Sequence, residues 1–151
     1  MIEVKQVSPR LAKQVHQISE ACLHGEGWSL AQYEQACEDG NLFLCAAVGD
    51  AVAGFIQCDV AYDSANLNLI AVSENFRRQN IAHSLIATAE EILKEYKLSQ
   101  NFDSVVFSLE VRSQNTSAQS LYQKCGFAKA GLRKKFYQDP PDDAVIYTKE
   151  L

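Results

Sequence analysis

The pattern of apolar and polar residues starts with an alternating stretch and changes at once to helical spacing. Residues 2–7 alternate, which predicts a first strand. Ser8 and Pro9 follow, an N-cap residue and a proline at the first helical position, so a helix is expected there. Its apolar face is formed by Leu11, Val15, Ile18 and Cys22.

The next segment combines a short helix with a hairpin. Ser29 and Gln32 have the spacing of a capping box, and Gly40 is expected to end the helix that they begin. Two apolar runs, 42–48 and 51–62, flank a Gly-Asp pair, which predicts two strands joined by a tight turn. The run 65–72 predicts a third strand, and its apolar end is typical of a central strand.

The second half alternates between helices and strands. A long helix is expected from Ile81, with one apolar stripe and with Glu90, Glu91, Lys94 and Glu95 outside it. A buried strand at 104–111 precedes a capped helix at 115–127 that stops at Gly126. Two final strands are expected around 128–137 and 144–150.

The predicted order is β-α-α-β-β-β-α-β-α-β-β. Hairpins join the early strands, whereas helices join the later ones. This predicts an α/β fold (mixed α+β) with a six- to seven-stranded mixed sheet and about four helices on both faces. A length of 151 residues with no linker or repeat favours a single domain, 1–151.

Composition narrows the functional classes. The net charge of −5 and the absence of a basic face argue against nucleic-acid binding. There is no signal-like h-region and no apolar run of membrane-spanning length, so no membrane partner is expected. The five cysteines lack metal or disulfide spacing and resemble small buried hydrophobes of a reducing, cytoplasmic protein. The three histidines have no metal-ligand spacing either, so no metal is expected.

The turn between the central strand and the long helix carries candidate chemistry. Unpaired amides at a helix start bind phosphate groups, and arginine donates to phosphate oxygens through a fork. Asparagine tolerates a left-handed backbone, and alanine permits close approach. The alternative is that the two arginines only decorate a solvated turn. The candidate pyrophosphate cradle consists of Arg77, Arg78, Gln79, Asn80, Ile81 and Ala82.

These residues, "RRQNIA", resemble the R/Q-x-x-G-x-G/A signature of the GNAT N-acetyltransferases. The strand "LIAV", the strand "VFSLEVR" and the helix "NTSAQSLYQKCGF" fall where that family has them, and the resemblance covers nearly the whole chain. The run "LEVRSQNTSAQSLYQKCGF", "WSLAQY" and the tail with "FY" and "DDAVIY" resemble the bacterial ribosomal-protein-alanine N-acetyltransferases. The resemblance implies a GNAT fold and acetyl-CoA as co-substrate. Asn80 replaces the signature glycine, which places a side chain near the expected phosphates.

Acetyl transfer to an amine requires a base, an acid and a polarised carbonyl. Glu110 is the candidate base because it ends an apolar strand, where partial burial makes a carboxylate a better proton acceptor. The alternative is a solvent-facing glutamate or a pair with Arg112. Tyr122 is the candidate acid, since a phenol can protonate a leaving thiolate, and the alternative is a tyrosine that only packs. The resemblance implies both roles.

Further binding residues follow from the resemblance. Backbone groups of Ile70, Ala71 and Val72 would polarise the thioester and bind pantetheine. Asn115 is expected to cap its helix, and the resemblance adds a cofactor contact. A peptide groove could be lined by aromatic and acidic residues, although such residues are more often core or solvated turn. These residues are Trp28, Tyr33, Phe136, Tyr137 and Asp142.

The expected function is acetyl-CoA-dependent acetylation of a protein N-terminal amine, such as that of a small-subunit ribosomal protein. The alternatives are acetylation of a small amine and a non-catalytic acyl-CoA-binding module. An open peptide groove would favour a protein N-terminus as the acceptor, whereas a closed pocket would favour a small amine. The expected oligomeric state is a monomer or a weak homodimer.

Overall fold

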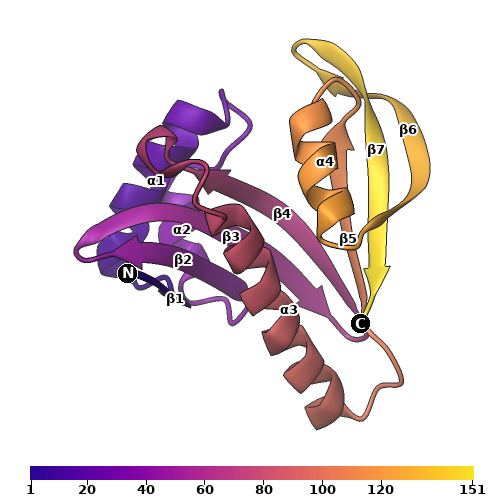
Figure 1. Cartoon of the computed structure of the whole chain (residues 1–151), viewed down its shortest axis with the longest axis horizontal. Helices are drawn as coiled ribbons and strands as arrows, with labels where there is room; N and C mark the ends of the chain where they lie inside the picture. The colour runs from indigo at the N-terminus through magenta and orange to yellow at the C-terminus, as the bar shows by residue number, and fades with distance from the viewer. The chain divides into compact units, whose positions relative to one another are not determined.

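The structure is a computed structural model that describes all residues from 1 to 151, and Figure 1 follows the chain from one end to the other. The elements are β1 (Ile2–Gln6), a 3-10 turn η1 (Pro9–Leu11), α1 (Ala12–Cys22), α2 (Leu30–Ala36), β2 (Leu42–Val48), β3 (Ala51–Ala61), β4 (Ser64–Val72), a 3-10 turn η2 (Glu74–Phe76), α3 (Ile81–Gln100), β5 (Val106–Arg112), α4 (Thr116–Lys124), β6 (Ala128–Gln138) and β7 (Pro141–Glu150). Hydrogen bonds join seven strands in the order β1-β2-β3-β4-β5-β7-β6.

The chain divides into two compact units. The first contains residues 1–59 and 68–91, and the second contains residues 60–67 and 92–151. Both β4 and α3 contribute residues to each unit. The predicted element order and the mixed sheet with four α-helices are confirmed.

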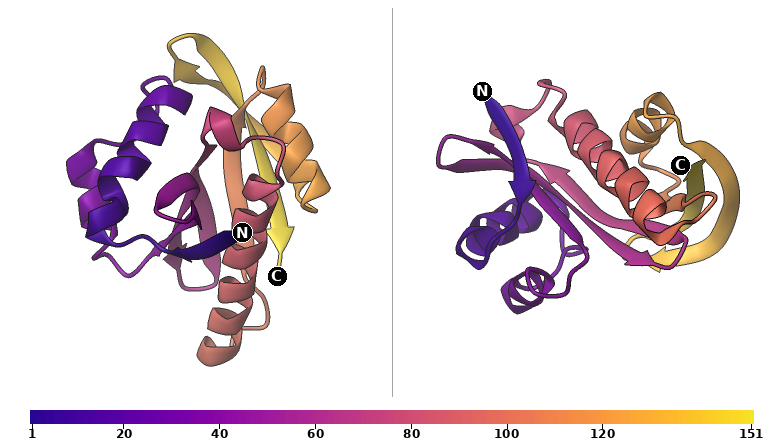
Figure 2. Two further views of the ribbon diagram at one scale, coloured as in Figure 1. Left: turned by 60° about the vertical axis from the view of Figure 1, so that its left-hand side comes forward. Right: turned by 90° about the horizontal axis from the view of Figure 1, so that it is seen from below.

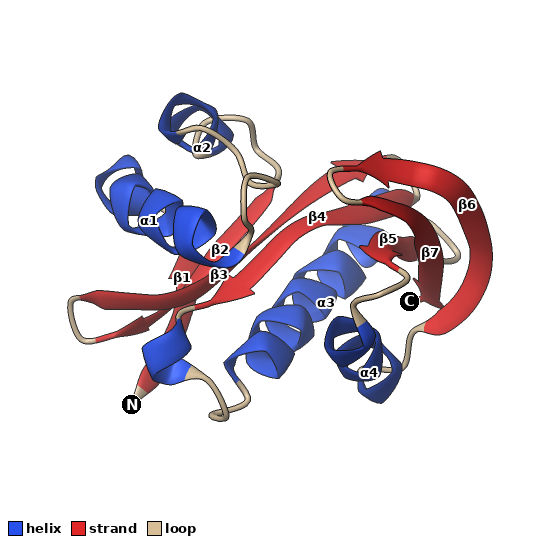
Figure 3. Ribbon diagram, turned by 90° about the horizontal axis from the view of Figure 1, so that it is seen from above, coloured by secondary structure: helices blue, strands red, loops and turns tan.

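The first unit is a helix–sheet–helix arrangement. Its strands β1, β2 and β3 are antiparallel neighbours, and a register shift lies between Ala46 and Ala47 on β2. The helices α1 and α2 lie on one face, and the first turns of α3 lie on the other (Figure 3). Between α1, α2 and the strands is a core in which Tyr33, Phe43 and Phe55 are fully or almost fully buried and have their rings in contact.

The predicted helix boundaries agree with the structure in part. The capping box is present: Gln32 N–H donates to the Ser29 hydroxyl at 3.2 Å, and Ser29 N–H donates to the Gln32 side chain at 2.8 Å. This helix ends at Ala36 rather than at Gly40. Ser8 makes no capping hydrogen bond with its side chain, since a 3-10 turn precedes α1.

The stripe of α3 is wider than predicted. Ile81, Leu85 and Leu93 are buried as expected, whereas Glu90 is also buried. Glu90 follows Ile86 by one helical turn, so it lies at the edge of the stripe and not outside it.

Gly54 brings β3 and β4 close together. A Cβ at this position would lie 2.8 Å from the carbonyl oxygen of Ala71 and 3.2 Å from a methyl carbon of Val72. No side chain fits there without displacing backbone, because atoms of real side chains do not approach a carbonyl so closely.

The second unit is an αβ layer. Ser64–Leu67 of β4 pairs in parallel with Val106–Leu109 of β5, and β7 lies antiparallel between β5 and β6. The helix α4 lies along the inner side of the curved β6–β7 hairpin (Figure 2). Its contacts are aromatic, with the ring of Tyr122 at 6.0 Å from that of Phe127 and at 6.4 Å from that of Tyr147. The strand β7 begins at Pro141, three residues earlier than predicted, because the hairpin pairs almost to its tip.

Candidate active site

The turn before α3 has the backbone that an anion cradle needs. Arg78 and Asn80 adopt left-handed conformations, with φ of 65° and 59°. The carbonyl of Asn80 accepts the hydrogen bond from Ser84 N–H at 3.0 Å, so the helical ladder starts at this residue. The amides of the first turn, which begins with Ile81 and Ala82, therefore have no partner within the helix and lie at its positive end.

Arg77 takes a different position from the one expected of a phosphate ligand. Its Nε donates to the carbonyl of Val72 at 3.3 Å, and its Nη2 lies 3.6 Å from the Sγ of Cys22. The Cys22 thiol also donates to the Val72 carbonyl, at 3.5 Å. The guanidinium thus fastens the end of β4 to α1, while Arg78 and Gln79 are exposed on the turn.

A cleft of about 390 Å³ lies beside the contact between Arg77 and Cys22. It opens between α1, the start of β3 and the segment that contains η2. Its lining includes Gln14, Gln17, Cys22, Glu74 and Arg77. This cleft is not predictable from the sequence, because its residues come from three separate segments.

Glu110 lies on the open face of β5. Strand alternation buries Leu109 and Val111 on the other face, as predicted, and leaves Glu110 half-buried. Its Oε2 atom is shielded from solvent and accepts no hydrogen bond. The Nε of Arg133 lies 3.8 Å away from this oxygen, at the distance of an ion pair.

Tyr122 lies on the opposite side of the same strands. Its ring contacts Tyr147, which pairs with Leu109 and so shares the face that α4 covers. Glu110 is the neighbour of Leu109 in the strand and points to the other face. The candidate acid, which is 6% exposed, and the candidate base therefore approach from the two sides of the sheet.

Two other predicted residues have clear structural tasks. Asn115 caps α4, since its side chain accepts the hydrogen bond from Ala118 N–H at 3.1 Å. Asp142 accepts hydrogen bonds from the Ser113 hydroxyl, from Gln114 N–H at 3.1 Å and from Asp143 N–H at 2.8 Å. These bonds, the Ser113 bond above all, lower the pKa of Asp142, and they tie the tip of the β6–β7 hairpin to the turn after β5.

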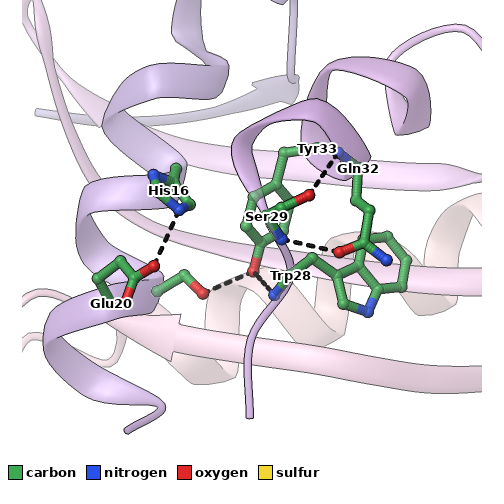
Figure 4. A network of polar contacts seen from close by, with 7 residues as sticks. His16, Glu20, Trp28, Ser29, Gln32 and Tyr33 are labelled. Atoms are coloured by element: carbon green, nitrogen blue, oxygen red, sulfur yellow. Dashed lines mark hydrogen bonds and ion pairs between the residues drawn. The ribbon is translucent and has the colours of Figure 1, made fainter. Parts of the chain in front are cut away.

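The aromatic residues predicted for a peptide groove differ in exposure. Trp28 and Tyr137 are partly exposed, and Phe136 is 46% exposed, whereas Tyr33 is fully buried. The Tyr33 hydroxyl accepts a hydrogen bond from Trp28 N–H at 3.3 Å, and the two rings lie 5.7 Å apart (Figure 4). This burial leaves Tyr33 no surface for a peptide, so it can influence one only by holding Trp28.

Three general properties complete the description. No helix combines the length and the apolar character that crossing a membrane requires. No group of three or more His, Cys, Asp or Glu residues is placed to hold a metal ion. All five cysteines are free thiols, and burial raises the pKa of Cys58 and of Cys45.

Comparison with known proteins assigns the chain to a family. Residues 12–127 match the acetyltransferase (GNAT) family. The chain belongs to this GNAT family. The predicted family, fold and enzyme class are therefore confirmed, and acetyl-CoA is the acetyl donor that this family uses.

Individual relatives agree with this assignment. A ribosomal protein bS18-alanine N-acetyltransferase of Salmonella typhimurium is 30% identical over 125 residues, which are 82% of this GNAT chain and 80% of that protein. A candidate enzyme of the same description from Bacillus subtilis is 36% identical over 95 residues, but the match spans only 59% of its length. The crystal structure of the Escherichia coli ribosomal-protein-S18-alanine N-acetyltransferase has the same fold, with a TM-score of 0.86 and 24% identity over 99% of this chain and 94% of that one.

Proposed function

We propose that this protein transfers the acetyl group of acetyl-CoA to the N-terminal α-amine of a protein, and that the acceptor is the alanine of a small-subunit ribosomal protein of the bS18 type. The observation that carries the proposal is the match to the Salmonella typhimurium enzyme across four fifths of both chains. The 151 residues act in it as one N-acetyltransferase domain of the cytoplasm, without a metal.

Acetyl-CoA is bound by the residues around the start of α3 and the end of β4. The unpaired amides of Ile81 and Ala82 and the positive helix end bind the pyrophosphate, with Arg78 and Gln79 on the exposed side of the turn. Backbone groups of Ile70, Ala71 and Val72 hold the pantetheine and polarise the thioester. Asn80 also belongs to this site. Arg77 supports it by holding the end of β4, and Asn115 supports it by capping α4.

Two side chains carry out the proton transfers of the reaction. Glu110 accepts the proton of the attacking amine, and its Oε2 has the vacant lone pairs that this requires. Tyr122 gives a proton to the departing thiolate. An α-amine titrates near pH 7.7–8.0 and a thiol near 8.5, so both transfers are within reach of ordinary side chains near neutrality.

In this proposal the base and the acid come from opposite faces of the strands and serve different atoms of the thioester. The amine arrives on one side of the thioester carbonyl, and the sulfur leaves on another, so the proton acceptor and the proton donor are needed in different places. Trp28 and Tyr137 contact the acceptor peptide in this proposal, while Tyr33 and Asp142 hold the segments that carry them.

The test is incubation with acetyl-CoA and a panel of peptides that differ in the first residue, read by mass spectrometry. One peptide carries the first residues of bS18. A second has the same sequence with a blocked α-amine and an internal lysine. Acetylation of the first and not of the second is expected. Acetylation of small amines alone, or binding of acetyl-CoA without turnover, would contradict the proposal.

A further inference from the structure

The candidate base has a defined set of neighbours on its own face of the sheet. Glu110 pairs with Ile146 on β7, and Ile146 pairs with Gly131 on β6. Paired residues of antiparallel strands point to the same face, so these three form one row across the strands. The adjacent row is formed by Arg112, Ala144 and Arg133.

Arg133 reaches the base by crossing an entire strand. Neighbouring strands lie about 4.8 Å apart, which puts β6 roughly 10 Å from β5. Ala144, which lies between them, is small, and Gly131 has no side chain that could fill the space beside it. The Arg133 side chain ends with its Nε at 3.8 Å from the Oε2 of Glu110.

The position of Arg133 is supported from its other side. Its guanidinium lies over the ring of Phe136, 5.6 Å from the centroid, in a cation–π contact. The register of β6 shifts between Arg133 and Tyr137, which adds residues to the strand at this point. Lys135 N–H donates to the side chain of Asp143 at 2.8 Å and holds the shifted segment.

The other arginine on this face is engaged elsewhere. Arg112 donates to the carbonyls of Pro140 at 2.7 Å and Asp139 at 3.3 Å, and its guanidinium lies over the Tyr137 ring. The ion pair of Glu110 is with Arg133. The paired residues on β7, Ile146 and Ala144, carry no charge.

The distance between the two groups decides what Arg133 does. At 3.8 Å it stabilises a carboxylate through its charge but donates no hydrogen bond to Oε2, whose lone pairs stay vacant. A base requires this combination, because a donated hydrogen bond would occupy the position that the incoming proton takes. A positive charge beside the base also favours the neutral, nucleophilic form of an arriving amine.

We propose that Arg133 is a positioning residue of the reaction, which orients the Glu110 carboxylate through its charge and leaves the lone pairs of Oε2 without a hydrogen bond. This inference rests on the proposed function. It extends that function by assigning a task to a residue on a strand that does not carry the base.

The test compares Arg133→Met with Arg133→Lys in steady-state kinetics, with acetyl-CoA and an alanine-initiated peptide. Methionine keeps an unbranched apolar stem without the charge, and lysine keeps the charge. We expect Arg133→Met to lower kcat about five- to tenfold with KM for acetyl-CoA unchanged, and Arg133→Lys to recover most of the loss. Lys134→Met removes the adjacent exposed charge and serves as the matched control, with kcat unchanged.

A double-mutant cycle shows whether Arg133 acts through the base. In the Glu110→Gln background, Arg133→Met should cause no further loss. Wild-type kcat in Arg133→Met, an Arg133→Lys variant as impaired as Arg133→Met, or additive losses in the cycle would overturn the inference while leaving the acetyltransferase intact. Absence of turnover by the wild-type enzyme on every peptide would instead remove the proposed function, and the role of Arg133 with it.

Discussion

The hydroxyl of Tyr33 donates a hydrogen bond to the hydroxyl of Ser19 at 2.7 Å, in the interior between α2 and α1. The same oxygen accepts from Trp28 N–H, so one buried phenol joins both helices and the loop between them. Burial is the main cause that raises the pKa of Tyr33 above its ordinary value. Stability and the placement of Trp28 therefore depend on the same group.

Tyr33→Phe should destabilise the protein by about 1–3 kcal/mol, because it removes the partner of the buried Ser19 hydroxyl and of the partly buried Trp28 N–H. It should also change the dependence on pH. A raised folded-state pKa means that the neutral phenol stabilises the fold fully below about pH 10 and that this contribution is lost as the pH rises through the folded pKa. Denaturant titrations at a series of alkaline pH values should show a steeper decline for wild type than for Tyr33→Phe. Parallel declines would contradict this.

Glu110→Gln should lower kcat several-hundred-fold and leave acetyl-CoA affinity nearly intact, since base catalysis typically contributes about 10²–10⁴. Isothermal titration calorimetry measures the affinity, and a thiol-release assay measures the rate. Glu150→Gln, on an exposed glutamate at the end of β7, is the control for loss of one carboxylate. Unchanged turnover in Glu110→Gln would exclude this carboxylate as the base.

Asn80→Gly should not weaken acetyl-CoA binding, because the cradle that we propose uses backbone amides, and glycine adopts the φ of 59° without strain. Asn101→Gly is the matched control, since Asn101 has a φ of 61° at the far end of α3. Calorimetry on both variants separates a general effect of glycine from a local one. A marked loss of affinity in Asn80→Gly alone would show that the asparagine side chain itself contacts the ligand.

Asp142→Ala should loosen the tip of the β6–β7 hairpin. Hydrogen exchange should accelerate at the amides of Gln114 and Asp143, which donate to this carboxylate, and the melting temperature should fall. Because the folded pKa of Asp142 is lowered, its contribution is present above its ordinary pKa and is lost as the pH falls through the folded one. Asp139→Ala, on an exposed residue of the same tip, should leave the exchange rates unchanged, and equal effects of the two variants would refute the anchoring role.

Local rules of the sequence placed most elements. The Ser29–Gln32 capping box and the Asn115 cap were predicted from spacing and are present, because each depends on residues within one helical turn. The hairpin around Gly49 also follows the prediction. Features that depend on distant segments were predicted less well. Glu90 is buried at the edge of its stripe, and Tyr33 is buried in the core rather than exposed in a peptide groove.

The same distinction applies to the candidate site. Alternation in β5 was enough to predict that Glu110 would face away from its apolar neighbours. Its ion pair with Arg133 was not predictable, because it depends on the register of three strands and on an irregularity in β6. The orientation of the Arg77 side chain toward Val72 and Cys22 also depends on tertiary packing, so the sequence does not predict it.

The contact at Gly54 limits how this protein can diverge. Any side chain at position 54 would press on the carbonyl oxygen of Ala71, because its Cβ would lie 2.8 Å from that oxygen. Ala71 and Val72 belong to the backbone that we propose holds the pantetheine, so a substitution at 54 would be transmitted to ligand binding without touching the ligand. Libraries built to alter acceptor choice should therefore leave this codon unvaried.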